Sequence, residues 1–536
     1  MPFVGATVRS SPERENDFIE PPSCPGGGPM KQRVIDELEK IVGKERMSTK
    51  IADLYVYGFD ASIHHKNPDV IVKPANAREV SEIVKLANAT RTPVVPRGAG
   101  TAMCGHTVPL KGGIIMDMTL MNKIKEVRVE DLYCVVEPGV IYDKLNAVLG
   151  KKGFWFPTTP GSGEACTIGG MVVTNASGMR AIKYGATRDY VLGLEVVMPT
   201  GEIIHTGTRT LKNSSGYQID RLMVGSEGTL GIVTEITLKL AFKPKASAMT
   251  LAAFNSLQDA GRCVSNIIAR PLMPSAIELM DSVCIKAVNK CMNVGLPDVA
   301  AICMIEVDGH PTAVEEELKI VEEIARQSGA VHTEASSDKK KIDYWTYARK
   351  AIMPALSRYG EKFVSVALAD DMSVPISKIP EAVVAFQKIA EQNGVIVGTY
   401  GHSADGNLHT KMLVEPGSDD SWRRGEKAVG EIYDKVLELG GTVTGEHGVS
   451  ITKAPYMKKE RADSLETMRR IKKALDPKNI MNPGKIFDWD GNIIAHLRYP
   501  AFCESGGCMP SVKTCEGQDE QSAGGKQRRD IDPLVP

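Results

Sequence analysis

Two histidines on either side of an Asp-Gly pair predict a metal site built on a hairpin. The stretch GHSADGNLH, residues 401–409, holds His402 and His409, and β-branched residues flank it. Asp405-Gly406 favours a two-residue type I′ turn, which would place His402 opposite His409 with their Cβ atoms about 4.5 to 5.5 Å apart. One ion can then bind a nitrogen of each ring. For an isolated pair, two ordinary cross-strand histidines are an equal alternative.

A second short stretch, GEHG at residues 445–448, supplies a carboxylate and another imidazole between two glycines. Two histidines and one glutamate make a three-ligand centre with open positions, which is typical of catalytic zinc, iron(II) or manganese. We therefore predict that Glu446 joins His402 and His409 on the metal. Adjacent residues of an extended chain point to opposite sides, so His447 is assigned to proton transfer instead.

A glycine-containing turn, RGAGT at residues 97–101, follows a strand-like run and offers backbone N–H groups that can cradle a pyrophosphate. The dinucleotide fingerprint of the Rossmann fold is not matched, because Met103 and Cys166 stand where GAGTAM and GSGEAC need a third glycine. No Walker A sequence is present. Taken alone, the turn is as readily a plain tight loop. A second glycine-dense stretch at residues 160–185 favours a cofactor site.

The elements expected to position these residues fall into two halves. In the first, the pattern predicts a helix over residues 30–42. It then predicts a strand at DVIVKP, a helix over residues 77–89 and a second strand at PVVPRGAGT. In the second, AAICMIEVDG and FVSVALADD predict strands, followed by helices over residues 312–328 and 380–393. This alternation is typical of a ferredoxin-like domain.

At 536 residues, the chain is long enough for two or three domains. We expect a disordered leader over residues 1–29, a first domain over 30–243, a second over 244–490 whose last helices return to the first, and a tail over 491–536. The tail thiols Cys503, Cys508 and Cys515 match no standard metal-ligand spacing, so disorder or partner docking is favoured there.

Charge and hydropathy exclude several classes of function. The 65 basic and 66 acidic residues nearly cancel, which gives no electrostatic case for binding nucleic acid or an anionic membrane. No apolar run approaches the roughly 18 to 20 residues of a transmembrane helix, and the N-terminus lacks an apolar signal core. We therefore expect a cytoplasmic protein whose 11 cysteines are reduced.

A series of motifs connects these pieces in one order along the chain: RGAGT, TIGG, NASG leading to KYG, GSEGTLGIVT, GHSADGNLH, GEHG and NPGK. With them the sequence resembles the FAD-linked dehydrogenases of the vanillyl-alcohol oxidase and p-cresol methylhydroxylase (PCMH) fold, and within these the D-lactate and glycolate dehydrogenase group. The resemblance implies an α+β protein. A two-subdomain PCMH-type FAD-binding domain would be followed by a ferredoxin-like α+β cap that lies over the flavin.

The resemblance also implies which residues hold FAD, with the diphosphate at the 97–101 loop. The expected contacts are Arg97, Gly98, Ala99, Gly100, Thr101, Gly161, Ser162, Thr167, Gly170, Asn175, Ser177, Gly178, Tyr184, Gly185, Glu227, Gly228, Ile232 and Asn482. Some relatives attach the flavin covalently through a histidine. His106 falls five residues past Thr101 and does not match that pattern, so we predict non-covalent FAD.

From the same resemblance, Arg349 is expected to clamp the substrate carboxylate, which a planar guanidinium can bind bidentately. The reaction implied is oxidation of a small D-2-hydroxy acid, D-lactate or glycolate, with hydride passing to flavin N5 while His447 removes the hydroxyl proton beside the metal. Electrons would leave to a protein acceptor, such as an iron–sulfur subunit or an electron-transferring flavoprotein. Relatives that act on 2-hydroxyglutarate carry a lysine where Ala369 stands, which favours a monocarboxylate here.

Three alternatives stay open: a D-2-hydroxyglutarate dehydrogenase, a non-redox flavin transferase of the alkylglycerone-phosphate synthase type, and a flavin-holding scaffold subunit without a substrate site. The GHSADGNLH and GEHG stretches speak against the last two. Two departures from the family pattern concern loop shape. Ala404 stands where GHxGDGNLH has glycine, and Ser450 follows GEHGV where glycine is usual.

Overall fold

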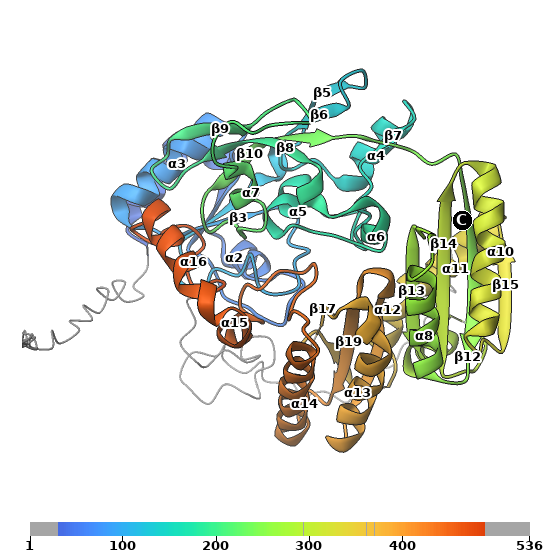
Figure 1. Ribbon diagram of the computed structural model, residues 1–536. Helices are drawn as coiled ribbons and strands as arrows, with labels where there is room; N and C mark the ends of the chain where they lie inside the picture. Colours follow the sequence, from blue (N-terminus) through green and yellow to red (C-terminus); the bar gives the residue numbers. More distant parts are fainter. Residues whose placement is uncertain (1–29, 293, 361, 369, 488–536) are drawn as a thin grey trace, which may run out of the picture.

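The computed structural model describes residues 30–292, 294–360, 362–368 and 370–487. They form two α+β halves that lie side by side, the first drawn in blue to green and the second in green to orange (Figure 1). The predicted leader, the tail with its three cysteines, and position 369 fall outside the described residues.

The first half begins with helix α1 (Gln32–Val42) and a four-stranded sheet in the order β1-β2-β4-β3. Strands β2 (Val70–Val72) and β3 (Val94–Arg97) both run parallel to β4 (Ile114–Asp117), which lies between them, while β1 (Met47–Ser48) is an antiparallel edge. Helix α3 (Ala77–Thr90) begins at Asn76, whose side chain accepts the Glu79 N–H, and buries Val80, Ile83, Val84 and Ala87. The glycine turn therefore begins where the parallel strand β3 ends.

A five-stranded antiparallel sheet follows, in the order β5-β6-β10-β8-β9. Its strands are β5 (Ile124–Arg128), β6 (Tyr133–Val136), β8 (Val191–Val197), β9 (Ile203–Gly207) and β10 (Ile232–Lys239). Helices α4 (Tyr142–Gly150) and α5 (Ile168–Thr174) bury Leu145, Leu149 and Met171 against it, in one core with Val136 and Ile236. The short helix α6 (Ala181–Tyr184) reaches toward the second half (Figure 1).

The second half is built on one large sheet whose first four strands have the ferredoxin-like order β15-β12-β14-β13. These are β12 (Ala246–Phe254), β13 (Ala276–Asp281), β14 (Ala301–Gly309) and β15 (His332–Ser336), connected in part by α8 (Leu257–Ile268) and α10 (Pro311–Gln327). The predicted ferredoxin-like cap is confirmed. However, the strand predicted over FVSVALADD is shorter than expected: among the described residues of that run, Val364–Val366 pair as β16, and β17 (Met372–Ser373) begins just after the run.

The same sheet continues through β18 (Ile396–His402) and β19 (Asn407–Val414), which carry the two predicted metal histidines. Helices cover both of its faces. Helix α8 packs with α13 (Ile379–Gln392) and α14 (Asp419–Glu438) on one face, and α9 (Ser282–Met292), α11 (Lys339–Lys350) and α12 (Ile352–Leu356) lie on the other. Alternate residues of β12 accordingly enter two different cores, Ala252 and Phe254 in one and Leu251 and Ala253 in the other.

After the second half, α15 (Ala454–Glu460) and α16 (Ala462–Leu475) lie against the first half (Figure 1). The buried Lys472 donates to the backbone oxygens of Thr229 and Met481, and Met481 bridges in parallel to Val94 at the start of β3. The end of the described chain thus supports the strand that leads into the glycine turn. None of the helices in the described part of the chain has both the length and the apolarity that a bilayer crossing requires.

Candidate active site

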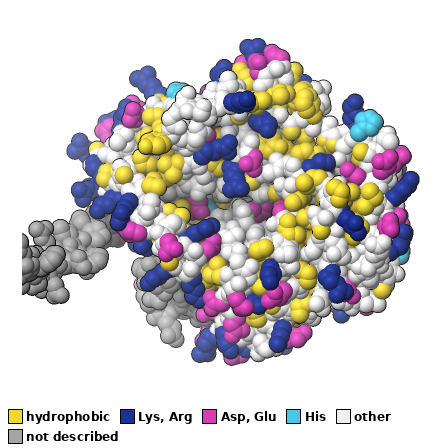
Figure 2. Space-filling view, viewed as in Figure 1, with side chains coloured by type: hydrophobic (Ala, Val, Ile, Leu, Met, Phe, Trp, Pro, Cys, Tyr) yellow, Lys and Arg dark blue, Asp and Glu magenta, His cyan; other side chains and the backbone are white. Residues whose placement is uncertain are grey.

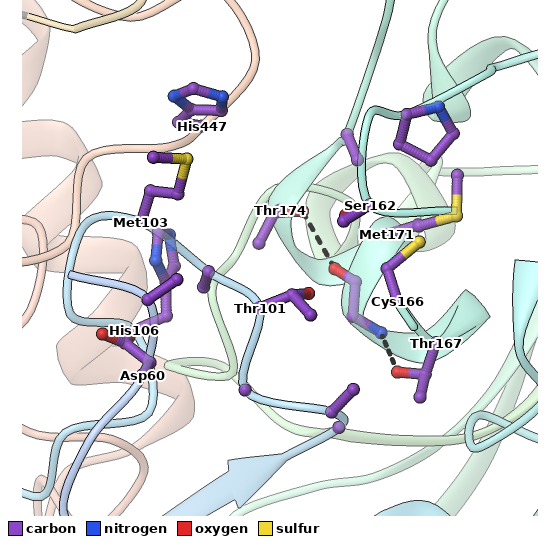
Figure 3. A pocket seen from close by; sticks show the side chains of 18 of the residues that line it. Asp60, Thr101, Met103, His106, Ser162, Cys166, Thr167, Met171, Thr174 and His447 are labelled. Carbon is purple, nitrogen blue, oxygen red and sulfur yellow. Dashed lines mark hydrogen bonds between the residues drawn. The ribbon is translucent and has the colours of Figure 1, made fainter. Parts of the chain in front are cut away.

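A cavity of about 710 Å³ lies where the two halves meet, and residues of both line it. The first half contributes the 97–101 turn, residues 159–162, helix α5 and residues 227–228; the second contributes Arg349, Tyr400, His402, His409, Glu446 and His447. Close up, His447, Met103 and His106 lie on one side of this space, opposite Ser162, Cys166 and Met171 (Figure 3). Several Lys and Arg side chains surround the recess between the halves (Figure 2).

The hairpin that carries His402 and His409 is not the predicted one. Tyr400, not His402, is the Cα partner of His409, so the register differs from the prediction by two residues. A type I′ turn needs positive φ at both central residues, but here only Gly406 is left-handed (φ 86°), and residues 403–405 form a 3-10 turn. A shift of two keeps every side chain on its face. The two rings therefore still meet, with centroids 5.2 Å apart.

Three imidazoles converge on one carboxylate oxygen in the cavity. The Nε2 atoms of His402, His409 and His447 lie 3.5, 3.6 and 3.6 Å from Oε1 of Glu446. These separations are long for hydrogen bonds. They are close to the roughly 3.3 to 3.6 Å between neighbouring ligand atoms around a tetrahedral ion with bonds of about 2.0 to 2.2 Å. The donor set therefore fits a divalent transition metal.

Buried carboxylates hold the other ring nitrogen of both predicted histidine ligands. Glu278 lies opposite His402 across the β13 and β18 pair, and its Oε1 is 2.6 Å from His402 Nδ1. Asp370 Oδ1 lies 3.2 Å from His409 Nδ1, while its Oδ2 accepts from Lys411 Nζ at 2.5 Å. The hydrogen bond with Glu278 fixes the tautomer of His402 that leaves its Nε2 lone pair toward the metal position. At His409 the Asp370 carboxylate lies beside Nδ1 and favours the same tautomer by its charge, although the two atoms do not make a hydrogen bond.

A second possible ligand set replaces His402 with Asp371 and His447, since ligand atoms of Asp371, His409, Glu446 and His447 lie within 4.8 Å of one another. The partners of Asp371 argue against it. Its carboxylate accepts the backbone N–H groups of Glu446 and His447 and further hydrogen bonds from the side chains of Asn407, Thr444 and Lys453. A carboxylate with five donors organises the loop and has no lone pair left for an ion.

The buried ionisable groups have shifted pKa values with identifiable causes. Burial opposes ionisation of Glu278, but Arg349 and His402 outweigh it and hold the pKa of Glu278 below its usual range. Burial likewise opposes ionisation of Asp370, and Lys411 and His409 hold its pKa well below the usual range. Burial lowers the pKa of His447 despite the nearby Asp371 and Asp370. The lowered pKa favours the neutral imidazole of His447, the form that can accept a proton.

Arg349 lines the cavity at the end of α11 and is itself buried. Its Nε donates to Glu278 Oε2, and its guanidinium carbon lies 4.7 Å from the centre of the Tyr400 ring. Within the described residues its two terminal nitrogens make no hydrogen bond, so a guanidinium edge remains for an anion in the cavity.

Where the first half lines the cavity, the backbone of residues 97–101 leaves space that side chains would fill. A Cβ on Gly98 would lie 2.2 Å from Thr167 Oγ1, and Gly100 has a left-handed φ of 71°. The Arg97 guanidinium does not point freely into this space, because Nη1 donates to Phe59 O and Thr107 Oγ1. The turn thus offers uncharged backbone to a cofactor, which fits the phosphates and ring edges of FAD.

Most predicted FAD contacts line the cavity, but Asn175, Gly178, Tyr184, Gly185 and Asn482 do not. Asn175 accepts the Arg188 N–H, and the Tyr184 hydroxyl donates to Asp308 of the second half. Asn482 donates to the backbone oxygens of His106 and Glu227. The side chains of Asn175, Tyr184 and Asn482 therefore make hydrogen bonds within the protein and do not line the cavity.

The sequence analysis did not identify Glu278, Asp370 or Asp371 as residues of the site. A signal was present, since Glu278 interrupts the apolar run SAIELM and the Asp pair ends the run FVSVALADD. Carboxylates are almost never fully buried without partners, so an acidic residue inside a buried strand indicates a site. Which histidine each carboxylate would contact depends on the sheet order, which the local pattern does not contain.

Comparison with known proteins agrees with this geometry. Residues 68–207 match the family described as "FAD binding domain", and residues 243–486 match "FAD linked oxidases, C-terminal domain". Over 460 residues the chain is 38% identical to "Glycolate oxidase subunit GlcD" of Bacillus subtilis, covering 85% of this chain and 97% of that protein. The chain belongs to the FAD-linked D-lactate and glycolate dehydrogenase family. It is an FAD-linked oxidoreductase.

A second relative supports this assignment, and two solved structures share the fold. "D-lactate dehydrogenase [cytochrome], mitochondrial" of Arabidopsis thaliana is 35% identical, covering 85% of this chain and 80% of that protein. A 4-ethylphenol oxidase from Gulosibacter chungangensis (TM-score 0.71, 17% identity, 86% of this chain and 97% of that one) has the same fold. The structure of p-cresol methylhydroxylase with substrate bound also has this fold. Its TM-score is 0.68 at 16% sequence identity, over 85% of this chain and 97% of that one. The predicted PCMH-type fold is confirmed.

Proposed function

We propose that this protein oxidises a small D-2-hydroxy acid, D-lactate or glycolate, to the 2-oxo acid. One observation carries the proposal: a single cavity contains the three converging imidazoles with Glu446, the available edge of Arg349, and the glycine turn of the flavin-binding half. A 2-hydroxy carboxylate presents one anionic group and one adjacent hydroxyl. Arg349 and the metal position match these two groups within the same space.

The residues around each end of the cavity would hold the two cofactors. FAD would lie non-covalently along the 97–101 turn and the wall formed by α5, and a divalent ion, Zn, Fe or Mn, would be bound by His402, His409 and Glu446. When bound, FAD supplies a hydride acceptor, and the ion lowers the pKa of a hydroxyl beside it. Glu278 and Asp370 keep the two histidines aimed at the ion.

His447 is the residue proposed to take the hydroxyl proton. Its side chain is more exposed to the cavity (21%) than those of His402 (13%) and His409 (6%). Its Nδ1 lies 3.6 Å from Asp370 Oδ2, a carboxylate that stabilises the imidazolium formed when Nε2 accepts a proton. Because burial lowers its pKa, His447 begins the reaction as the free base.

Arg349 is proposed to bind and orient the substrate carboxylate. Its pairing with Glu278 and its contact with Tyr400 fix the plane of the guanidinium, so the carboxylate is received in one orientation. Electrons would then leave to another protein, an iron–sulfur subunit or an electron-transferring flavoprotein. The Bacillus subtilis relative is named as a subunit, and the Arabidopsis relative is named with a cytochrome, which supports a protein acceptor.

The first prediction tests the substrate. Purified protein is mixed without oxygen with D-lactate, L-lactate, glycolate or D-2-hydroxyglutarate, and loss of flavin absorbance is followed by stopped flow. We expect D-lactate or glycolate to bleach the flavin at least tenfold faster than L-lactate and D-2-hydroxyglutarate. Fastest bleaching by D-2-hydroxyglutarate would move the substrate to a dicarboxylate. Flavin that no hydroxy acid bleaches would favour the transferase or the scaffold subunit.

A further inference from the structure

The loop that carries Glu446 and His447 is held by carboxylates from opposite halves of the molecule. From its own half, Asp371 accepts the N–H groups of these two residues. From the first half, which we call the flavin half, Glu227 accepts the N–H of Val449 at 2.7 Å and that of Ser450 at 2.9 Å. Both carboxylates are buried, so each bond is made without competition from water. We call residues 445–450 the catalytic loop.

Glu227 is rigidly placed for this contact. It lies in the GSEGT segment just before β10 with a left-handed φ of 55°, a strained conformation for a residue with a side chain, which persists only where the surrounding contacts hold it. Its backbone is tied at both ends, because its N–H donates to Val173 O and its carbonyl accepts from Asn482. Val173 belongs to α5, which forms the opposite wall of the cavity.

The catalytic loop approaches this carboxylate as closely as its backbone allows. A Cβ on Gly448 would lie 2.8 Å from Glu227 Oε1 and 2.6 Å from His106 Nε2, and Gly448 itself is left-handed (φ 78°). Only glycine fits there. On its other side, the Glu227 Oε2 atom lies 3.3 Å from His106 Nε2, so the carboxylate has a partner within the flavin half as well.

We propose that Glu227 is a positioning residue, which sets the place of His447 and Glu446 relative to the flavin half of the cavity. Its side chain acts on the catalytic loop, and its role as an FAD contact becomes secondary. Asp371 fixes the loop within the cap, whereas Glu227 fixes it to the half that binds the flavin. The consequence for turnover rests on the proposed function, while the anchoring of the loop does not.

The test compares Glu227→Gln with a matched control. An amide has one acceptor oxygen, so one of the two loop N–H groups loses its partner. The control is Glu137→Gln, because Glu137 is equally buried and accepts a backbone N–H, from Lys123 at 2.8 Å, entirely within the flavin half. In hydrogen exchange of the FAD- and metal-loaded proteins, amides of residues 446–450 should exchange at least tenfold faster in Glu227→Gln. In Glu137→Gln they should match the wild type.

Single-turnover flavin reduction supplies the second measurement. At saturating hydroxy acid, Glu227→Gln should be slower by about 10- to 100-fold, since misplacement of catalytic groups by about 1 Å costs this much. The apparent substrate Kd and the FAD content should match those of the wild type, because the substitution changes neither Arg349 nor the wall formed by α5. A residue that serves only folding would lower the melting temperature or FAD content and leave the loaded enzyme with its normal rate.

Defined outcomes would overturn the proposal. Wild-type exchange of residues 446–450 in Glu227→Gln refutes the anchoring, and loss of FAD with unchanged exchange makes Glu227 a flavin contact instead. If Glu227→Gln does not fold, Glu227→Asp retracts the carboxylate by one methylene and keeps its charge beside His106, and the same two measurements apply. If no hydroxy acid reduces the wild type, the proposed function fails, and the exchange result still decides the anchoring.

Discussion

At the scale of single residues, the site depends on which nitrogen of each histidine is occupied. His402 and His409 have a carboxylate on Nδ1, at 2.6 and 3.2 Å, whereas the nearest carboxylate oxygen to His447 Nδ1 is 3.6 Å away. The three rings are otherwise equally close to Glu446. The first two rings are therefore the better oriented ligands, and the third retains freedom to accept a proton and turn.

This difference predicts separate effects of two substitutions. His447→Ala should keep FAD and metal yet slow flavin reduction by about 10² to 10⁴, the usual contribution of a positioned general base. In the wild type the base form exists above the His447 pKa, which burial lowers, so kcat/KM should fall as pH drops through a pKa below about 6.5. Stopped-flow reduction over pH 5 to 8, with metal analysis, checks both.

Glu446→Ala is the comparison for that experiment and should lose the metal. If His447→Ala instead loses metal and regains a normal rate when metal is added back, the two roles have been exchanged.

At the scale of elements, the sequence predicted the histidine hairpin in part. The β-branched runs on either side of Asp405-Gly406 predict two strands that carry His402 and His409 close together. The predicted type I′ turn was wrong. The Asp405 side chain accepts the Asn407 N–H and stabilises a 3-10 turn, in which Gly406 is the one central residue with a left-handed φ. The predicted side chains share a face only because the register shift is even.

Ser450 and Ala404, the two positions where the family usually has glycine, differ in backbone conformation. Ser450 has a left-handed φ of 41°, and its buried hydroxyl has no hydrogen-bond partner within the described residues. Ala404 is buried in the 3-10 turn and does not have positive φ. Glycine is therefore favoured at position 450 by the backbone itself, and position 404 has no such need.

We accordingly expect Ser450→Gly to stabilise the protein by about 0.5 to 1 kcal/mol, since relief of left-handed strain exceeds the entropy lost by glycine on folding. Ala404→Gly is the matched substitution and should destabilise by about 1 kcal/mol, because a buried methyl is lost and the unfolded chain gains freedom. Calorimetric melting temperatures of the FAD-loaded proteins should move in opposite directions. Movement in the same direction would contradict this account of the loops.

At the scale of the whole molecule, the active site is an interface between halves that the chain crosses repeatedly. Beyond the catalytic loop, Arg180 of the flavin half pairs with Glu306, and Lys183 with Asp308, both buried acids of β14. The sequence contains these residues but not their proximity, since 126 and 125 positions separate the partners. Contacts between residues this far apart in the chain cannot be predicted from local patterns in one sequence. The contacts of Glu278 and Asp370 with the histidines were missed for the same reason.

Because the two halves contribute different sets of residues to the cavity, we predict that the metal and the flavin can be removed separately. The proposed ligands all belong to the second half, whereas the expected FAD contacts that line the cavity belong to the first. Chelation, or His409→Ala, should therefore abolish turnover and leave the bound flavin spectrum nearly unchanged. Absorbance spectra, metal analysis and anaerobic reduction measured on one sample check all three quantities.

His205→Ala is the control, because His205 is a largely exposed histidine of β9 that pairs only with Glu195 in the described part of the chain. It should retain metal, flavin and turnover. Full activity of metal-free protein would remove the ion from the mechanism and leave the three imidazoles to act by proton transfer alone. Loss of FAD together with the metal would mean that the β18 and β19 hairpin supports the flavin half as well, so that the two cofactors bind to one cooperative unit.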